Sequence, residues 1–326
     1  MSSISSVFIT REVFDESIEL LKKNFKVISN QNDTLFNNFQ LLENLKKVNI
    51  VQSSGSDILD EKILSNCPLL NVISNTAVGY NNIDIDYCTK NKIMVFNTPN
   101  VLDDTVADFA ILQMLSVARG TLSNDKYVRE KHWKKVFLKQ EMGIDFHNKK
   151  LGLIGFGRIG KKIAKRAKAF DLQINYYCRN QEKSDIENQY NAYYSDLNSL
   201  CKNSDFIVLI VPYTKDTHHL ISYEEISLMK KNSIIVNIAR GGVINDVALI
   251  QALREKKIYG AGIDVFEDEP KINKRFYELD NVVLSPHVGS GTYDTRKAMS
   301  LKASENIISA VVHKKFTNLV NKEVLY

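Results

Sequence analysis

Three glycines at positions 155, 157 and 160 form a G-x-G-x-x-G pattern in this 326-residue sequence. The apolar run 151–154 precedes them, and apolar residues at helical spacing follow: Ile159, Ile163, Ala167 and Phe170. A strand, a glycine turn and a helix in this order favour a pyrophosphate at the helix N-terminus, where unpaired N–H groups and the helix dipole attract anions. Gly155 would allow the turn, Gly157 would admit the phosphates, and Gly160 would let helix and strand pack closely. The stretch predicts a dinucleotide site; the alternative is an ordinary glycine-rich turn.

The residues after the next expected strand, 173–177, bear on which dinucleotide binds. An NAD site commonly has an acidic residue there, which binds the ribose 2′-OH. This sequence has Cys178, Arg179 and Asn180 instead. A guanidinium can pair with a 2′-phosphate in forked geometry and can stack on the adenine. The pattern predicts NADP(H) as the preferred cofactor, with NAD(H) possible; the alternative is a solvated surface arginine and loose selectivity.

Ionisable residues follow the ends of three further expected strands. Arg240 precedes two glycines, Asp264 and Glu269 share one loop, and His287 follows Pro286. Because ligands of open α/β sheets bind beyond the carboxyl ends of the strands, we expect these groups to converge on the nicotinamide. Taken singly, each has a structural alternative: an arginine capping a turn, solvated loop acids, and a histidine with local partners.

Short apolar runs alternate with helical patterns along the chain. In the first hundred residues they predict strands at 7–9, 26–28, 48–51, 72–73 and 93–95, with a helix at 12–24. A second series predicts strands at 151–154, 174–177, 206–211, 234–238, 259–265 and 282–284. This alternation predicts an α/β fold with two doubly wound parallel sheets.

Turn residues at 97–100 and 285–287 interrupt the two series, and an amphipathic helix is expected at 292–313. Simple packing would return that helix to the first domain. We therefore expect a discontinuous substrate domain, residues 1–99 and 287–326, and a dinucleotide-binding domain, residues 100–286. Two crossings between the domains would form a hinge, with the cleft between them as the ligand site.

Composition excludes several classes of protein. Hydrophobic residues make up 44% and charged residues 25%, as in soluble globular proteins, and the net charge of +5 is too small to predict nucleic-acid binding. The four cysteines form no CxxC pair and no zinc-ligand spacing, so we expect reduced thiols in a cytoplasmic protein and no metal site. No secretory signal is evident, and no run reaches the roughly 18 apolar residues of a membrane span. The nearest candidate, residues 106–118, is broken by Asp108 and Gln113 and is expected to be a buried helix.

A basic helical segment is predicted at 119–140. It contains Trp133 among the cations Lys126, Arg129, Lys131, Lys134, Lys135 and Lys139. A solvated face is favoured over a nucleic-acid surface. The tryptophan indicates that part of the segment packs on something, such as a second subunit.

With these residues in view, the whole chain resembles the D-isomer-specific 2-hydroxyacid dehydrogenases, and within them the glyoxylate/hydroxypyruvate (2-ketogluconate) reductase branch. The matching stretches, besides the glycine pattern, are residues 78–84, 97–99 with 105–108, Pro212 with 217–220, 237–242, 264–270 and 287–290. The resemblance implies a Rossmann-type cofactor domain inserted into a flavodoxin-like discontinuous substrate domain, and a homodimer formed through the cofactor domains.

The resemblance also implies roles for individual residues. Arg240 would bind the substrate carboxylate and polarise the C2 carbonyl, His287 would exchange the proton, and Glu269 would hold His287 and raise its pKa. The backbone of Val78 and Gly79, with Ser290, would complete the substrate site. Asp264 would bind the nicotinamide carboxamide, and further residues would line the cofactor site: Thr105, Arg158, Ile159, Pro212, Thr217, Ala239 and Gly289.

The expected function is NADPH-preferring reduction of small 2-keto acids, with glyoxylate and hydroxypyruvate leading, to D-2-hydroxy acids. The alternatives within enzymes are an NAD-dependent D-lactate or D-3-phosphoglycerate dehydrogenase. The first usually looks NAD-selective, and the second often has a regulatory domain, for which there is no room after Tyr326. Formate dehydrogenase is disfavoured because it has an amide where Glu269 stands. The alternative of a different class is a dinucleotide-sensing scaffold similar to the C-terminal-binding corepressors.

Overall fold

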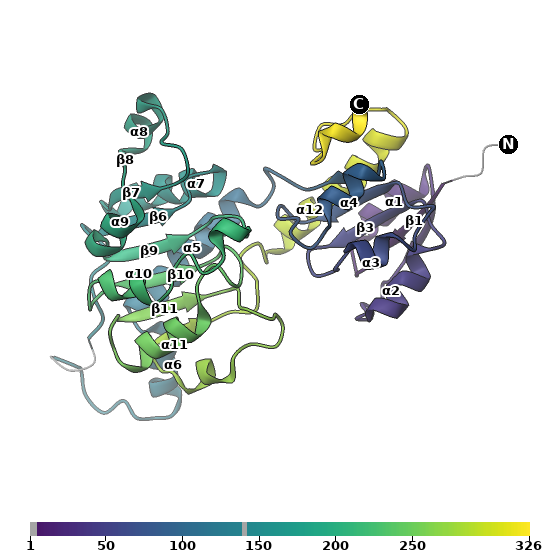
Figure 1. Ribbon diagram of the computed structural model, residues 1–326. Coiled ribbons are helices and arrows are strands. Elements are labelled where there is room, and N and C mark those ends of the chain that lie inside the picture. The colour runs from purple at the N-terminus through teal and green to yellow at the C-terminus, as the bar shows by residue number, and fades with distance from the viewer. Residues whose placement is uncertain (1–4, 139–141) are drawn as a thin grey trace. The chain divides into compact units, whose positions relative to one another are not determined.

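The computed structural model describes residues 5–138 and 142–326 (Figure 1). The chain divides into two compact units, unit 1 with residues 1–102 and 292–326 and unit 2 with residues 103–291. Each unit is built on one parallel sheet, which confirms the predicted fold class. The boundaries expected from the sequence were 99/100 and 286/287, and the assignment of substrate and cofactor to the two units stays a prediction.

Unit 1 contains a five-stranded parallel sheet with the order β2-β1-β3-β4-β5. This is the flavodoxin-like order, in which the winding reverses between β1 and β3. The strands are β1 (Ser6–Ile9), β2 (Lys26–Ser29), β3 (Ile50–Ser54), β4 (Val72–Thr76) and β5 (Met94–Phe96). The helices are α1 (Asp15–Lys22), α2 (Asn38–Leu45), α3 (Glu61–Leu64), α4 (Ile85–Lys90), α12 (Tyr293–Val311) and the 3₁₀ turn η4 (Lys322–Leu325).

Both faces of the unit 1 sheet are buried, because consecutive strand residues point to opposite sides. Phe8, Val51 and Ile73 lie in the cluster that includes residues of α2, α3 and α4. Their neighbours Val7 and Ile50 lie in the other cluster, with residues of α1 and α12. The return of the last helix to the first domain is thus confirmed.

Unit 2 contains a seven-stranded parallel sheet with the order β12-β11-β10-β9-β6-β7-β8. The winding reverses between β6 and β9, as in a Rossmann fold. The strands are β6 (Lys150–Ile154), β7 (Gln173–Tyr177), β8 (Ala192–Tyr194), β9 (Phe206–Leu209), β10 (Ile234–Asn237), β11 (Gly260–Ile263) and β12 (Val282–Leu284). Strand β8 was not predicted from the sequence; it is three residues long and exposes two tyrosines.

Helices cover both faces of this sheet. Helix α5 (Asp103–Ala118) is the buried helix expected at 106–118, and α7 (Arg158–Ala167) packs Ile163, Ala164 and Ala167 inward. The remaining helical elements are α6 (Thr121–Arg129), α8 (Ser184–Tyr190), α9 (Leu197–Asn203), α10 (Tyr223–Leu228), α11 (Asp246–Arg254), η1 (Lys168–Phe170), η2 (Lys215–Thr217) and η3 (Lys274–Glu278). Among the described residues no helix is long and apolar enough to cross a membrane.

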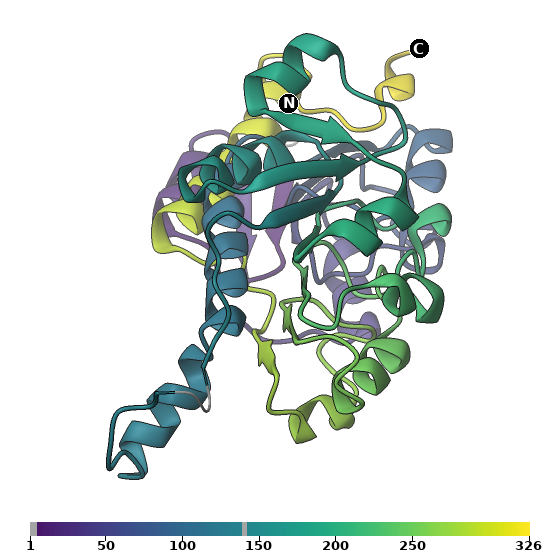
Figure 2. The same cartoon turned by 90° about the vertical axis from the view of Figure 1, so that its left-hand side faces the viewer.

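The basic segment is helical over only part of the predicted range. Helix α6 ends at Arg129, and Lys131 adopts a left-handed conformation (φ 60°) that stops the helix. Figure 2 shows α6 and the chain after it extending away from the unit 2 sheet, and α6 buries no residue. Trp133 is 60% exposed, and Lys139 and Gln140 lie outside the described residues.

Candidate active site

The glycine turn lies at the carboxyl end of β6, beside the point where the winding of the unit 2 sheet reverses. Gly155 has a φ of +106°, which disfavours any residue with a Cβ, and a Cβ there would lie 2.7 Å from the Ile210 carbonyl oxygen. A Cβ on Gly160 would lie 2.7 Å from the Gly155 carbonyl oxygen, so helix α7 can approach the turn only because this residue is glycine.

Gly157 differs from the other two glycines, because a Cβ placed on it meets no atom within 4 Å. It is the N-cap residue of α7 and provides no side-chain hydrogen bond to the helix N-terminus. The first N–H groups of α7 therefore face an open position that suits an anion. The residues present fit the pyrophosphate of a dinucleotide.

At the end of β7, Cys178 is half-buried and its thiol donates to the Asn180 carbonyl oxygen at 2.8 Å. Arg179 is exposed and makes no hydrogen bond or ion pair with any other described residue. Glu182 also belongs to this loop, which the sequence argument overlooked, but Lys161 pairs with it at 2.8 Å. The negative charge nearest to Arg179 in sequence is thus compensated by a lysine of α7.

Arg240, Glu269 and His287 come together beyond the ends of β10, β11 and β12. Glu269 Oε2 lies 2.8 Å from His287 Nδ1, and Glu269 Oε1 accepts the Phe266 N–H at 2.8 Å. Burial acts to raise the pKa of Glu269, but the bond and charge of His287, the Phe266 N–H and Arg240 outweigh it and lower the pKa. Glu269 is therefore a carboxylate that can accept an N–H from the imidazole.

The Arg240 turn approaches the Glu269 loop closely because Gly241 has no side chain. A Cβ on Gly241 would lie 1.7 Å from the Phe266 carbonyl oxygen. The guanidinium is half-buried, with Nη1 donating to the Ala239 carbonyl oxygen at 2.7 Å. Burial lowers the pKa of Arg240 while the charge of Glu269 raises it, and an arginine remains a cation in such a setting. A planar cation thus lies near an acid-bound imidazole.

His287 has a left-handed backbone conformation, with a φ of 53°. Its N–H donates to the Asp264 carbonyl oxygen at 2.9 Å. The Asp264 carboxylate accepts the Val288 N–H at 2.9 Å, the Gly289 N–H at 2.8 Å and the Ser285 hydroxyl at 2.7 Å. Burial raises the pKa of Asp264 although these donors oppose the change. Asp264 therefore fixes the chain on both sides of His287.

The other expected cofactor residues of unit 2 lie on the same sheet edge or on α5 and α7. Arg158 begins α7 and donates from Nε to Asp103 at 3.1 Å, and the Thr217 hydroxyl donates to the Pro212 carbonyl oxygen at 2.7 Å. The rest are placed as follows: Ile159 half-buried on α7, Thr105 half-buried on α5, Ala239 buried after β10, and Gly289 and Ser290 after His287.

Val78 and Gly79, the expected substrate contacts of unit 1, follow β4 in a half-buried loop. The Val78 carbonyl oxygen accepts from Asn97 Nδ2 at 2.8 Å, and the Gly79 carbonyl oxygen accepts from Asn75 Nδ2 at 3.0 Å. The sequence argument did not assign these two asparagines any role.

A second acid–imidazole pair was also missed. His219 Nε2 lies 2.9 Å from Glu267 Oε1, which also accepts the Asp246 N–H at 3.1 Å. Burial, with the charge of Glu267, raises the pKa of Asp246 to about 7. Sequence analysis assigned no role to His219, because a carboxylate 48 positions away gives no local signal.

Comparison with known proteins agrees with this fold. Residues 111–289 match the family model described as D-isomer specific 2-hydroxyacid dehydrogenase, NAD binding domain. The chain belongs to the D-isomer-specific 2-hydroxyacid dehydrogenase family and is an NAD(P)-dependent oxidoreductase.

Individual relatives narrow the comparison. A glyoxylate reductase from Pyrococcus horikoshii is 42% identical over 323 residues, which cover 98% of this chain and 96% of that protein. A solved glyoxylate reductase from Paecilomyes thermophila superimposes with a TM-score of 0.89 at 28% identity, covering 99% of this chain and 100% of the other. An NADPH-dependent glyoxylate/hydroxypyruvate reductase from Sinorhizobium meliloti, solved with NADP and malonate, gives a TM-score of 0.88 at 27% identity, covering 99% and 98%.

Proposed function

We propose that this protein is an NADPH-preferring reductase of small 2-keto acids, glyoxylate and hydroxypyruvate in particular, that forms D-2-hydroxy acids. The observation that carries the proposal is the grouping of Arg240, Glu269 and His287 on the same sheet edge as the glycine turn. The printed functions of the relatives from Pyrococcus horikoshii and Sinorhizobium meliloti support it.

Arg240 is the substrate-binding cation in this proposal. A 2-keto acid carries a carboxylate next to the reacting carbonyl, and a guanidinium can donate to both groups in one plane. As negative charge develops on the C2 oxygen, a donor already held in place stabilises it without reorganisation. The backbone N–H groups of Val78 and Gly79, and Ser290, are the further proposed substrate contacts.

His287 is the proposed proton donor. Glu269 occupies Nδ1, so the proton exchanged with the substrate oxygen belongs to Nε2. The Glu269 carboxylate accepts the Nδ1–H and so fixes the orientation of the ring. In the oxidative direction the neutral imidazole accepts the proton from the hydroxyl group.

The proposed cofactor residues bind and orient the dinucleotide. A reduced nicotinamide supplies the hydride when it is bound. The N-terminus of α7 at Gly157, Arg158 and Ile159 would hold the pyrophosphate, and Asp264 would accept from the carboxamide. Arg179 would pair with the 2′-phosphate, with Cys178 and Asn180 beside it. The remaining cofactor contacts are expected from Thr105, Gly155, Gly160, Pro212, Thr217, Ala239 and Gly289.

The experiment that tests this function is a spectrophotometric panel. NADPH and NADH are each combined with glyoxylate, hydroxypyruvate and pyruvate, and absorbance of the reduced nicotinamide is followed. We expect the highest kcat/KM for NADPH with glyoxylate or hydroxypyruvate. Turnover confined to pyruvate with NADH would favour a D-lactate dehydrogenase, and cofactor binding without turnover would favour a dinucleotide-sensing scaffold.

We also infer a homodimer in a reducing, cytoplasmic setting. Residues after α6 leave large apolar side chains exposed, with Trp133 at 60%, Val136 at 70% and Leu138 at 90%. Covering this segment with a second copy would remove it from water. All four cysteines are free, which suits a reducing compartment. Light scattering of the purified chain tests the dimer.

A further inference from the structure

In unit 1, the loop after β4 has its peptide groups oriented by side chains of other segments. Asn97, just beyond β5, donates from Nδ2 to the Val78 carbonyl oxygen at 2.8 Å. Asn75, within β4, donates from Nδ2 to the Gly79 carbonyl oxygen at 3.0 Å. Because a trans peptide holds its C=O and the following N–H in opposite directions, the Asn97 bond points the Gly79 N–H away from Asn97, and the Asn75 bond points the Tyr80 N–H away from Asn75.

The peptide between Ala77 and Val78 is held in place in a similar way. The Ala77 carbonyl oxygen accepts the Thr98 N–H at 2.9 Å, which points the Val78 N–H away from Thr98. These bonds together orient the N–H groups of three consecutive residues, Val78, Gly79 and Tyr80. Within residues 5–138 and 142–326, none of the three donates to a protein acceptor. A row of such donors is an anion-binding arrangement.

Both asparagines are held in place by further bonds. Asn75 is fully buried, and its Oδ1 accepts the Ser53 hydroxyl at 3.1 Å. The Asn97 carbonyl oxygen accepts from Asn306 Nδ2 at 2.8 Å, on α12, and Asn306 Oδ1 accepts from Asn318 Nδ2 at 2.8 Å. The C-terminal part of the chain thereby fixes Asn97, so the orientation of the loop does not depend on a bound ligand.

We propose that Asn97 and Asn75 are positioning residues that orient the Gly79 and Tyr80 N–H groups toward the carboxylate of the 2-keto acid. This inference rests on the proposed function for its ligand. Neither asparagine touches the substrate; each acts by fixing one peptide plane. The consequence is a third amide donor, from Tyr80, beside the two expected at Val78 and Gly79.

The test replaces Asn97 with alanine, which removes the donor, and with aspartate, which keeps the shape but presents an acceptor to the Val78 carbonyl. For both variants we expect KM for glyoxylate to rise about tenfold, the size of one weakened hydrogen bond to a charged group, while kcat and KM for NADPH change less than about threefold. Calorimetric affinity for oxalate in the presence of NADP⁺ should fall in parallel. Asn75→Ala should act in the same direction.

Asn321→Ala is the matched control. Asn321 is buried in the same unit and binds the backbone of Val95 and Ile93, but it does not contact the loop after β4. It should lower the melting temperature and leave KM for glyoxylate unchanged. Unaltered KM and oxalate affinity in Asn97→Ala and Asn97→Asp, or an equal rise in Asn321→Ala, would overturn the inference. A wild-type protein whose oxalate affinity falls on replacement of Asn97, but which reduces no keto acid, would reject the proposed function and retain the positioning role.

Discussion

The two units are built on parallel sheets of similar design, yet the corresponding edges of the two sheets are filled differently. In each, the winding reverses between two central strands, β1 and β3 in unit 1 and β6 and β9 in unit 2. Ligands of such sheets bind at the carboxyl side of this reversal. In unit 2 that position holds the glycine turn and the open N-terminus of α7.

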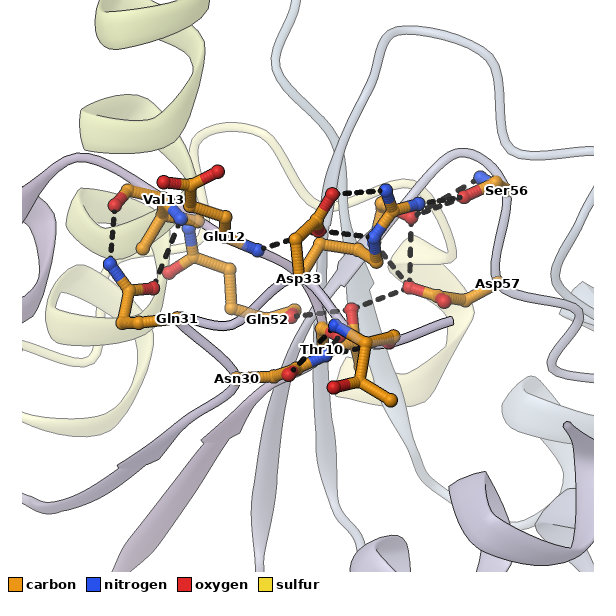
Figure 3. Close-up of polar contacts among 12 residues, drawn as sticks. Thr10, Glu12, Val13, Asn30, Gln31, Asp33, Gln52, Ser56 and Asp57 are labelled. Atoms are coloured by element: carbon orange, nitrogen blue, oxygen red, sulfur yellow. Dashed lines mark hydrogen bonds and ion pairs between the residues drawn. The ribbon is translucent and has the colours of Figure 1, made fainter. Parts of the chain in front are cut away.

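In unit 1 the protein's own carboxylates occupy the equivalent position (Figure 3). Arg11 donates to Asp33 from Nε at 2.6 Å and from Nη2 at 2.8 Å. Asp57 accepts the Thr10 hydroxyl at 2.5 Å and the Ser54 N–H at 2.7 Å. Sheet topology therefore provides a position for an anion, and local residues decide whether a ligand or a side chain occupies it.

The largest effect on the reaction rate is expected from replacing His287, the proposed proton donor on the unit 2 edge. His287→Gln should lower the single-turnover rate of glyoxylate reduction about 10²- to 10⁴-fold, the usual contribution of a general acid, with cofactor affinity nearly unchanged. Rapid mixing of the enzyme–NADPH complex with glyoxylate measures this rate. A rate equal to that of the wild type would reject the role of His287. Arg11→Gln, on the unit 1 edge, is the control and should leave the rate within about threefold.

Asp246 in unit 2 and Asp33 in unit 1 should make folding stability depend on pH with opposite signs. Burial raises the pKa of Asp246 to about 7, so the folded state binds the proton more tightly and stability falls as pH rises from about 4 through 7. The bond from Arg11 lowers the pKa of Asp33, so its contribution is present above about pH 4 and is lost as pH falls further.

Denaturant unfolding at a series of pH values separates the two cases. Between pH 4 and 7 the wild type should lose up to about 3 kcal/mol of unfolding free energy through Asp246, and Asp246→Asn should abolish this loss. Asp33→Asn should cost about 1 kcal/mol at neutral pH and less in acid, since the pair is partly exposed. Parallel pH profiles for wild type and Asp246→Asn would contradict the assignment.

Substitution of the turn glycines should show that Gly157 is needed for cofactor binding and Gly155 for folding. Gly157→Ala adds a Cβ to open space and should leave the melting temperature within about 2 °C, while raising KM for NADPH roughly thirtyfold. Gly155→Ala should destabilise the protein itself, because φ is +106° and a backbone oxygen lies 2.7 Å from the new atom. An equal loss of stability in both variants would contradict the separate roles of the two glycines.

The smallest effect concerns the exposed arginine at the end of β7. Arg179→Ala should lower kcat/KM with NADPH about five- to tenfold and leave that with NADH nearly unchanged, since only the 2′-phosphate pairs with the guanidinium. Lys161→Ala, which releases Glu182 from its ion pair, should shift preference in the same direction. A wild-type preference for NADH, or equal losses with both cofactors in Arg179→Ala, would refute the proposed selectivity.

Sequence reasoning succeeded best where the signal is local. The strand before Gly155, the helix after it, and the alternation of apolar runs all depend on neighbours within a few positions, and β6, α7 and the other predicted strands match. It failed for β8, which buries only one of its three residues and so shows no apolar run, and for the basic segment, where the positive φ of Lys131 ended the helix at Arg129.

The sequence alone determined the fold class, the family and the list of candidate residues, because glycine spacing, apolar period and motif order are properties of contiguous stretches. Only the tertiary structure decided which of those groups meet. Asn97 with Val78, His219 with Glu267, and Glu269 with His287 pair across 18 to 48 positions. Such contacts are fixed by how strands lie side by side in the sheets, and no local pattern encodes that distance.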